Sequence, residues 1–398
     1  MSSVRPTTLD DATAVERLLG DAVDNYRGRL VELPAAMRDL DIRRPIRVPP
    51  HTRGLRLAGQ SQHFTTFHLN FNDTDLPPER RVLFELVNAR DFVAEHFGVY
   101  AEKYAAAVAV HRSLRVREDN SLMTHPVWRH ITVQGGARLI EDGFVHTAVQ
   151  LDGSKAHDVN DEHAAYEHVT IDNLAGSAFV FAHAQAKAMS VTDCDWSGCG
   201  RHGIDATGRG RWGAGADQGG TFTATRCKGG YSDVAEFGVG RPAGPVRVLG
   251  GDFEGVVALL RQPDPYAGPS MNAQPITIEV DRCAAARLRP DGGLIAVFNG
   301  GPLRVLGGEI GEGAPRPPLI YHGGLAGIST IVEGVSFVAE GADHVFPVIQ
   351  ERIGRYAVGD WHGGPRTLRV RHNLYRGGPM GCWVVPEFER DETQDAPR

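Results

Sequence analysis

The sequence has few cysteines and no long apolar run. Its five cysteines, among 398 residues, are Cys194, Cys199, Cys227, Cys283 and Cys382. An odd number at irregular spacing argues against a disulfide framework and favours reduced thiols. No stretch approaches the ~20 continuous apolar residues that a membrane helix needs. The first six residues lack the apolar segment of a secretory signal, so we expect a cytoplasmic protein without membrane contact.

An excess of positive charge is also missing. The net charge is −7, and lysines and arginines are spread along the whole chain. Nucleic-acid binding requires a basic patch or stripe, so we expect no nucleic-acid partner. An acidic sugar is not excluded, because a few local arginines and lysines are enough to bind one. Glycine, in contrast, is abundant, with 48 residues, as expected for strands joined by tight corners.

Helical periodicity is confined to the N-terminal region, Thr8 to about Leu40. Thr8 or Asp10 is a suitable N-cap, and Gly28 and Pro34 are expected to interrupt the helix. Repeat proteins need their open ends covered, because an exposed end offers unpaired strands to other chains. We therefore interpret this region as an end cap rather than a partner-binding helix.

A short apolar and glycine-rich pattern recurs along the chain. Val248-Leu249-Gly250-Gly251-Asp252 returns as Val305-Leu306-Gly307-Gly308-Glu309, and related copies start at residues 191, 224, 248, 280, 305 and 331. Each copy follows an alternating segment, and most precede a second short apolar run. A repeat of this length without intervening helices predicts stacked coils of strands, each burying its inward side chains against its neighbours.

The pattern resembles the right-handed parallel β-helix of the pectate-lyase-like superfamily, which includes pectin-degrading enzymes, uronate epimerases and phage tailspikes. The resemblance covers roughly residues 42–375 and implies an all-β solenoid of about ten rungs. We divide the chain into a helical cap (1–41), a β-helix domain (42–380) and a C-terminal tail (381–398). The Arg-x-Pro-x-x-Arg, Gly-His-Gly and Asp-Pro-His signatures of that superfamily are absent, so the resemblance carries no catalytic residue over.

Stacking would align equivalent positions of the copies into ladders. Opposite charges one rung apart (~4.8 Å) would then pair, and we read these pairs mainly as surface contacts that keep the rungs in register. Position four is interpreted as a corner of small residues and not as a metal site. The third, fourth and fifth positions hold, respectively, Asp193, Arg226, Gly250, Arg282 and Gly307; Cys194, Cys227, Gly251, Cys283 and Gly308; and Asp195, Lys228, Asp252, Ala284 and Glu309.

A second row of polar residues lies near the ends of the following apolar runs. Imidazoles and carboxyls on neighbouring rungs of an outer face could perform general acid–base chemistry. An interpretation of equal weight is that these residues are only solvated strand ends without a catalytic role. A shift of one residue would move Glu236 from solvent to core. Arg201-His202-Gly203-Ile204-Asp205 is the nearest approach to a catalytic motif. The catalytic candidates are His183, His202, Asp205 and Glu236.

The loops supply candidates for substrate binding. Trp212 and Tyr231 could form an aromatic platform for a sugar ring, and guanidinium groups could bind its carboxylate; Trp212 could equally pack under its own loop. The histidine-rich segment 153–168 matches no recognised zinc spacing, so we expect no metal and no cofactor. The substrate-binding candidates are Arg226, Lys228, Arg261, Trp212, Tyr231 and His322.

These observations lead to three functional hypotheses. The first is an enzyme that uses acid–base residues on the outer face of a β-helix, a lyase, epimerase or glycosidase acting on a saccharide. The absence of a secretory signal counts against a scavenging polysaccharide enzyme. The second hypothesis is therefore a cytoplasmic small-molecule isomerase or cyclase on the same fold. The third is a non-enzymatic, tailspike-like binding protein, which would form homo-oligomers.

Overall fold

The structure, a computed structural model, describes residues 10–24, 30–71, 76, 81–101, 108–115, 125–150, 163–181, 188–206, 222–239, 246–254, 257–260, 276–279, 281–284, 294–298, 303–312, 319–323, 330–338, 349–351 and 368–376. The chain forms two compact units, Met1–Gly176 and Ser177–Arg398. The described helices include none that is both long enough and apolar enough to cross a membrane.

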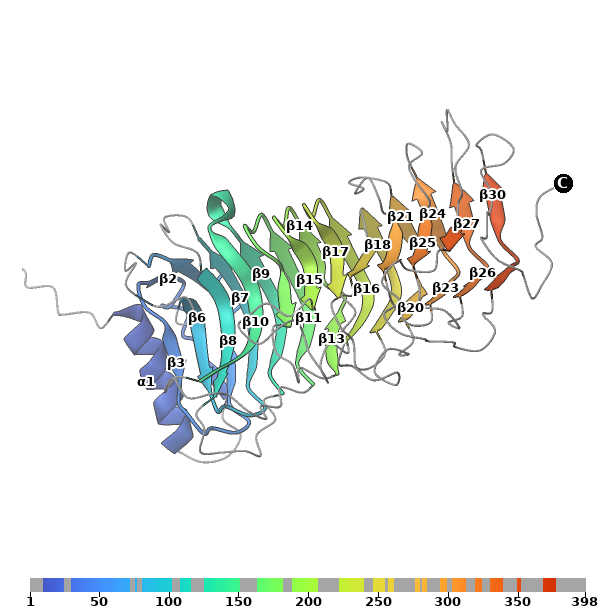
Figure 1. Cartoon of the computed structure of the whole chain (residues 1–398). Helices are drawn as coiled ribbons and strands as arrows, with labels where there is room; N and C mark the ends of the chain where they lie inside the picture. The colour runs from blue at the N-terminus through green and yellow to red at the C-terminus, as the bar shows by residue number, and fades with distance from the viewer. Residues whose placement is uncertain are drawn as a thin grey trace, which may run out of the picture. The chain divides into compact units, whose positions relative to one another are not determined.

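The first unit consists of short parallel strands preceded by one helix (Figure 1). One sheet, A1, contains β1, β2, β4, β5, β7, β9 and β11, and the other, B1, contains β3, β6, β8 and β10. The elements are α1 (Asp11–Asp24), β1 (Leu30–Glu32), β2 (Asp39–Ile42), β3 (Ile46–Val48), β4 (Arg56–Ala58), β5 (Thr66–Leu69), β6 (Val82–Val87), β7 (Val93–Tyr100), β8 (Val108–Arg115), β9 (Val127–Gln134), η2 (Gly136–Arg138), β10 (Ile140–Gln150) and β11 (Ala165–Asp172).

Helix α1 lies beside β3 at the start of this unit (Figure 1). Asp10 caps it, as predicted, because its Oδ1 accepts a hydrogen bond of 3.1 Å from the amide of Ala12. The helix ends at Asp24, and β1 and β2 occupy part of the stretch predicted to be helical. In β2, Leu40 and Ile42 are buried at every second position. A strand therefore buries these apolar residues, which the sequence pattern assigns to a longer helix.

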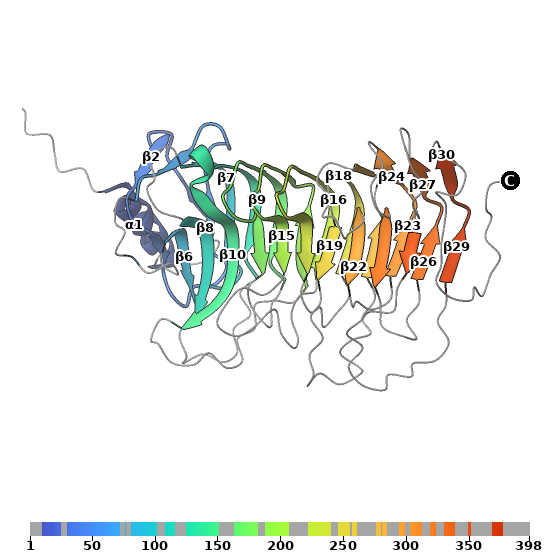
Figure 2. The ribbon, with the colours of Figure 1, turned by 45° about the horizontal axis from the view of Figure 1, so that its top comes forward.

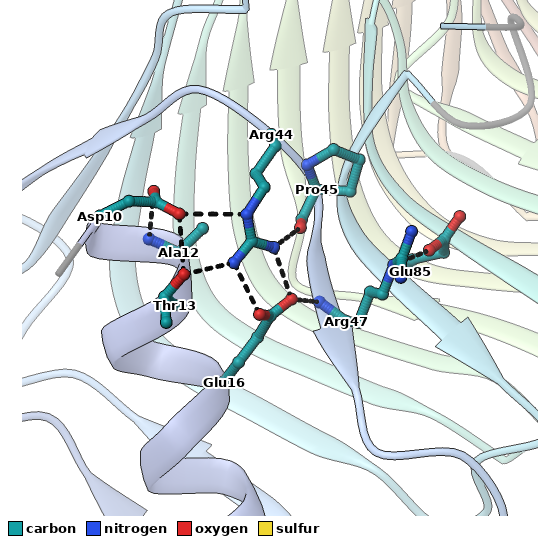
Figure 3. Close-up of polar contacts among 8 residues, drawn as sticks. All are labelled: Asp10, Ala12, Thr13, Glu16, Arg44, Pro45, Arg47 and Glu85. Carbon is teal, nitrogen blue, oxygen red and sulfur yellow. Dashed lines mark hydrogen bonds and ion pairs between the residues drawn. The ribbon is translucent and has the colours of Figure 1, made fainter.

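Arg44 fastens the helix to β3 (Figure 3). Its guanidinium donates to both carboxylate oxygens of Glu16 at 2.7 Å and to the hydroxyl of Thr13 at 2.6 Å. The amide of Arg47 also donates to Glu16. Burial acts to raise the pKa of Glu16, but the hydrogen bonds from Arg44 and Arg47 outweigh it and the pKa is lowered. The N-terminal helix, which is predicted to be an end cap, is therefore attached to the chain around β3 by specific polar contacts.

The second unit repeats one coil of three short strands. In the first of these coils β13, β14 and β15 follow one another, and the first half of β16 pairs with β13 while its second half pairs with β14. Strands of the type of β13 and β14 form sheet A2, and strands of the type of β15 form sheet B2, in which β15, β19 and β22 are seen in one layer (Figure 2). All these pairings are parallel, as the predicted parallel β-helix requires.

The strands of the second unit are β12 (Phe179–Phe181), β13 (Met189–Thr192), β14 (Asp195–Ser197), β15 (His202–Ala206), β16 (Phe222–Gly230), β17 (Ala235–Val239), β18 (Val246–Glu254), β19 (Val257–Leu260), β20 (Ile276–Glu279), β21 (Arg282–Ala284), β22 (Ile295–Phe298), β23 (Leu303–Leu306), β24 (Glu309–Glu312), β25 (Ile320–Gly323), β26 (Thr330–Glu333), β27 (Ser336–Val338), β28 (Ile349–Glu351), β29 (Leu368–Arg371) and β30 (Leu374–Arg376).

The corner between the two strand types of sheet A2 has a left-handed backbone. Asp193, Arg226, Gly250, Gly307 and Gly334 have φ angles between 51° and 69°. Glycine adopts this conformation without steric cost, which explains why the recurring pattern contains it. The position three residues after the corner lies in the core, where Trp196, Phe253, Cys283, Ile310 and Phe337 are all buried.

The register corrects two alignments made from the sequence. Val305 pairs with Val332, so the copy predicted to start at residue 331 starts one residue later. Asp252 pairs with Arg282, and Arg282 pairs with Glu309. The copy predicted to start at residue 280 is therefore displaced by two residues, and Arg282 belongs to the fifth position, not the third. Cys283 aligns with Phe253 in the core and not with Cys227. The segment before this copy differs in length from the corresponding segments of the other coils. The packing of the core, and not the similarity of residue types, determines how this copy aligns with its neighbours.

Candidate functional site

A buried imidazole–carboxylate pair lies on β15. His202 Nδ1 is 3.4 Å from Asp205 Oδ2. The hydroxyl of Ser177, just before β12, donates to Asp205 Oδ2 at 3.3 Å and accepts the amide of His202 at 3.3 Å. The amide of Ala178 donates to the carbonyl of His202 at 3.1 Å. The preceding coil therefore holds the backbone of His202 and the side chain of Asp205.

The pair lies on the outer side of sheet B2. Phe237 of β17 points inward, because its ring contacts Trp196, Phe222 and Phe253 of sheet A2. The next residue, Gly238, therefore faces the other way. A Cβ at Gly238 would lie 2.6 Å from Nε2 and Cδ2 of His202. The imidazole thus occupies the outer face of β17 at the point where a side chain is missing.

The imidazole of His202 is buried and lacks hydrogen bonds to the described residues. Its exposed fraction is 5% and that of Asp205 is 1%. Neither ring nitrogen of His202 makes a hydrogen bond to a described residue, although Nδ1 faces Asp205. A buried polar atom without a partner is uncommon in proteins and calls for an explanation. An imidazole with a carboxylate near one nitrogen, and with no described partner at the other, is suited to accept and return a proton.

Glu236, predicted to be on the outer face, lies instead in the interior. Its exposed fraction is 0%. Oε2 accepts hydrogen bonds from Trp196 Nε1 at 2.6 Å and from the hydroxyl of Ser232 at 2.7 Å, while Oε1 accepts the amide of Ser232 at 3.2 Å. Burial raises the pKa of Glu236 to about 7 even though these hydrogen bonds act to lower it. The hydrogen bonds from Trp196 of the previous coil and from Ser232 hold the side chain in the interior.

The two predicted basic candidates of the charge ladders lie on sheet A2. Arg226 forms a bidentate salt bridge with Asp193, in which Nε donates to Oδ1 at 2.7 Å and Nη2 donates to Oδ2 at 2.6 Å. Lys228 aligns with Asp195 on one side and Asp252 on the other. The predicted pairs Asp193–Arg226 and Asp195–Lys228–Asp252 are thus neighbours across the rungs. Neither Arg226 nor Lys228 is in the sheet that carries His202, so their use in substrate binding stays a prediction.

Of the remaining candidates, the structure describes Tyr231 and His322 only. Tyr231 lies in the corner before β17 and is 52% exposed. The backbone of His322 pairs with Val297 and Glu351 in sheet B2. His183, Arg261 and Trp212 lie outside the described residues, as does most of the histidine-rich segment.

Three histidines of the first unit form a stack. His96, His130 and His168 follow one another on β7, β9 and β11 with ring centroids 4.9 and 4.8 Å apart and nearly parallel planes. Burial and the neighbouring imidazoles lower the pKa of His130. Parallel rings direct their nitrogens side by side and not to one point. Within the described part of the chain, no three histidine, cysteine or acidic side chains are arranged to hold a metal ion.

Sequence reasoning finds the His202–Asp205 segment but misses Ser177 and the position of Arg201. Ser177 precedes His202 by 25 residues, and its role depends on the stacking of two coils. No local pattern marks it. Arg201 is exposed and directly precedes the pair, and its carbonyl accepts hydrogen bonds from Val234 and Ala235 of the next coil.

Comparisons with known proteins agree with the fold. No protein-family model matches the chain, and no curated protein sequence is significantly similar to it. Among solved structures, the chain is similar to the A-module of the Azotobacter vinelandii mannuronan C-5 epimerase AlgE6. The TM-score is 0.56 and the identity 13%, over 96% of each chain. This likeness, with the parallel pairings of both units, shows that the fold is the predicted parallel β-helix.

Proposed function

We propose that the protein is an enzyme that transfers a proton to or from a saccharide, with His202 as the acid–base group. The observation that supports this role is the buried His202–Asp205 pair on the outer side of sheet B2, with Nε2 lacking a partner among the described residues. Asp205 would orient the ring and stabilise the imidazolium that forms when Nε2 accepts a proton. Functional sites are where such buried, incompletely satisfied groups concentrate.

The arrangement favours proton abstraction over glycoside hydrolysis. Most glycosidases need two carboxyl groups on either side of the scissile bond. Asp205 faces His202 on the outer side of its sheet, whereas Glu236 is engaged by Trp196 and Ser232 in the interior. The two carboxyls therefore do not face one substrate. A single imidazole suits removal of a proton from a carbon next to a carboxylate.

The reaction can be written with its protons and electrons balanced. Neutral His202 takes the proton from the carbon next to the carboxylate of a uronic acid, and the electron pair moves into that carboxylate as an enolate. Protonation of the enolate from the opposite face by a water molecule gives the epimer, and the imidazolium of His202 gives its proton to the hydroxide that remains. Alternatively, the C–O bond at the adjacent carbon breaks as the double bond forms, and the departing alkoxide takes the proton from the imidazolium of His202, which gives the lyase product. The similar solved structure is by its title a mannuronan C-5 epimerase, which supports this reaction class at the level of the fold.

The test follows a proton at the reacting carbon. Wild type, His202→Asn and Asp205→Asn are incubated in deuterated water with mannuronan, pectate, a neutral glucan and uronic acid monosaccharides. Proton NMR reports deuterium uptake, and ultraviolet absorbance reports unsaturated products. We expect wild type to act on an acidic saccharide, and His202→Asn to lose at least ~100-fold of that activity. His372→Asn, an exposed histidine at a left-handed corner of the same unit, is the control.

Two results would contradict the proposal. One is the absence of any exchange or product on all substrates, and the other is activity that survives in His202→Asn. Circular dichroism and thermal melting of each variant show that a loss of activity is not a loss of folding. Activity on monosaccharides alone would favour the small-molecule enzyme over the polymer-acting one.

A further inference from the structure

Tyr231 combines a strained backbone with an exposed aromatic ring. Its φ angle is 59°, in a region that a bulky residue adopts only at a cost in free energy. Its side chain is one of the few large apolar groups in the described residues that are more than half exposed. Burial of the Tyr231 side chain therefore does not offset the free-energy cost of its left-handed backbone. Strained residues of this kind concentrate where a side chain must be held in a functional direction.

The corner that carries Tyr231 is fixed by its neighbours. The amide and hydroxyl of Ser232 both bind the buried carboxyl of Glu236. The amide of Asp233 donates to the carbonyl of Cys199 at 2.8 Å, and that of Val234 to the carbonyl of Arg201 at 2.9 Å. Three consecutive residues after Tyr231 are thus attached to the interior or to the previous coil. The surroundings determine the backbone so fully that the left-handed residue need not be glycine.

Tyr231 lies in the corner that stacks on the corner leading to His202, since the amides of Asp233 and Val234 bind the carbonyls of Cys199 and Arg201. The register of β14 with β16 places Tyr231 next to Gly198, because Ser197 pairs with Gly230. Gly198 has no side chain that could cover the tyrosine on that side. Three residues further on, Arg201 is exposed and directly precedes His202. An aromatic ring and a guanidinium thus border the coil on which the imidazole lies.

We infer that Tyr231 and Arg201 form a subsite for one ring of an acidic saccharide beside His202. The inference rests on the proposed function and adds the residues that would position the substrate. The face of the tyrosine would stack on the apolar side of a pyranose ring. The guanidinium of Arg201, with its fork of N–H donors, would bind the ring carboxylate. Glu236 acts in this site only indirectly, by fixing the corner through Ser232.

The decisive variant is Tyr231→Gly, because strain and function then predict opposite effects. Glycine relieves the left-handed strain, so we expect a higher melting temperature. Loss of the stacking surface should weaken binding of an oligouronate about tenfold. His372→Gly replaces another exposed residue with a φ of 53° and is the matched control. It should raise the melting temperature similarly and leave binding unchanged.

Binding is measured by calorimetry and saturation-transfer NMR in the His202→Asn background, so that turnover does not interfere. The ligands are an oligouronate and the same oligosaccharide with its carboxyls reduced to alcohols. Arg201→Gln should weaken binding of the first and leave the second unchanged. In the active enzyme, Tyr231→Gly should raise KM and change kcat less than about twofold.

The outcomes separate this subsite from the proposed function. Binding that depends on Tyr231 and Arg201 without any His202-dependent reaction would support the subsite and refute the catalytic proposal. Activity that depends on His202 with normal binding in Tyr231→Gly would overturn the subsite alone. A lower melting temperature in Tyr231→Gly would show that the ring stabilises the fold, and would also overturn it.

Discussion

Trp196 Nε1 donates a hydrogen bond of 2.6 Å to Glu236 Oε2 inside the second unit. The bond joins the core side chain of one coil to the second residue of β17 in the next coil. The same carboxyl holds Ser232, the residue after the strained Tyr231. A side chain with the chemistry of a general acid is therefore part of the framework. It connects the aromatic interior to a corner on the surface.

Glu236 should make the stability of the protein depend on pH. Its pKa is about 7 in the folded protein and 4.5 as a reference. The folded state therefore holds this proton more tightly, so the contribution of Glu236 to the stability of the second unit is greatest below pH 4.5 and falls as the pH rises towards 7. At 1.36 kcal/mol per pKa unit, the loss is on the order of 3 kcal/mol. Glu236→Gln should flatten this dependence in urea titrations, and the exposed Glu279→Gln should not. An unchanged slope in Glu236→Gln would show that the carboxyl is ionised in the fold.

Gly203 should not tolerate even a methyl group. A Cβ at this position would lie 2.0 Å from Nε1 and 2.3 Å from Cε2 of Trp196. Gly203→Ala must displace the indole and should lower the unfolding free energy by about 3 kcal/mol. The control is Gly20→Ala in α1, where nothing lies within 4 Å and a gain of about 0.8 kcal/mol is expected. Chemical denaturation measures both, and equal effects would contradict the packing described.

His111 should make the first unit sensitive to acid. The residue is fully buried, with Nε2 3.1 Å from Ser113 Oγ and its ring against Trp128 and His146. Burial, with the nearby His146 and Arg112, lowers its pKa well below 6.5. The unfolded chain then binds the proton more readily, so stability falls as the pH drops below 6.5. Melting curves should show less of this loss in His111→Phe, a change supported by the aligned Phe84 and Phe144. His63→Phe, at an exposed site, should retain the full loss.

Lys228 should keep neighbouring coils in register through charge. It lies between Asp195 and Asp252, and the ladder continues through Arg282 to Glu309, so that signs alternate. Lys228→Glu would place three carboxylates in a row and should destabilise the protein by about 1 kcal/mol at low salt. The effect should shrink at high salt because these groups are partly exposed. Lys228→Gln should have a smaller effect. A loss for Lys228→Glu that does not depend on salt would point to packing instead.

The repeat in the sequence determined the fold. Alternating apolar residues such as Val246 and Val248 face inward wherever they recur, and Gly250 and Gly307 mark corners that need a left-handed backbone. These are properties of single coils, so they can be read without knowing which coils touch. Asp10 as a helix cap is equally local.

Only the tertiary structure decided the partners of each coil. The segments between strands differ in length, so the alignment of Arg282 with Asp252 depends on the packing of whole coils. Hydrogen bonds from Trp196 and Ser232 hold Glu236 in the interior, and stacking brought Ser177 to Asp205 across 28 residues. Local pattern specifies which residues are apolar and where the chain bends. Contacts between coils specify which polar groups meet, because a displacement of one residue reverses the direction of every side chain in a strand.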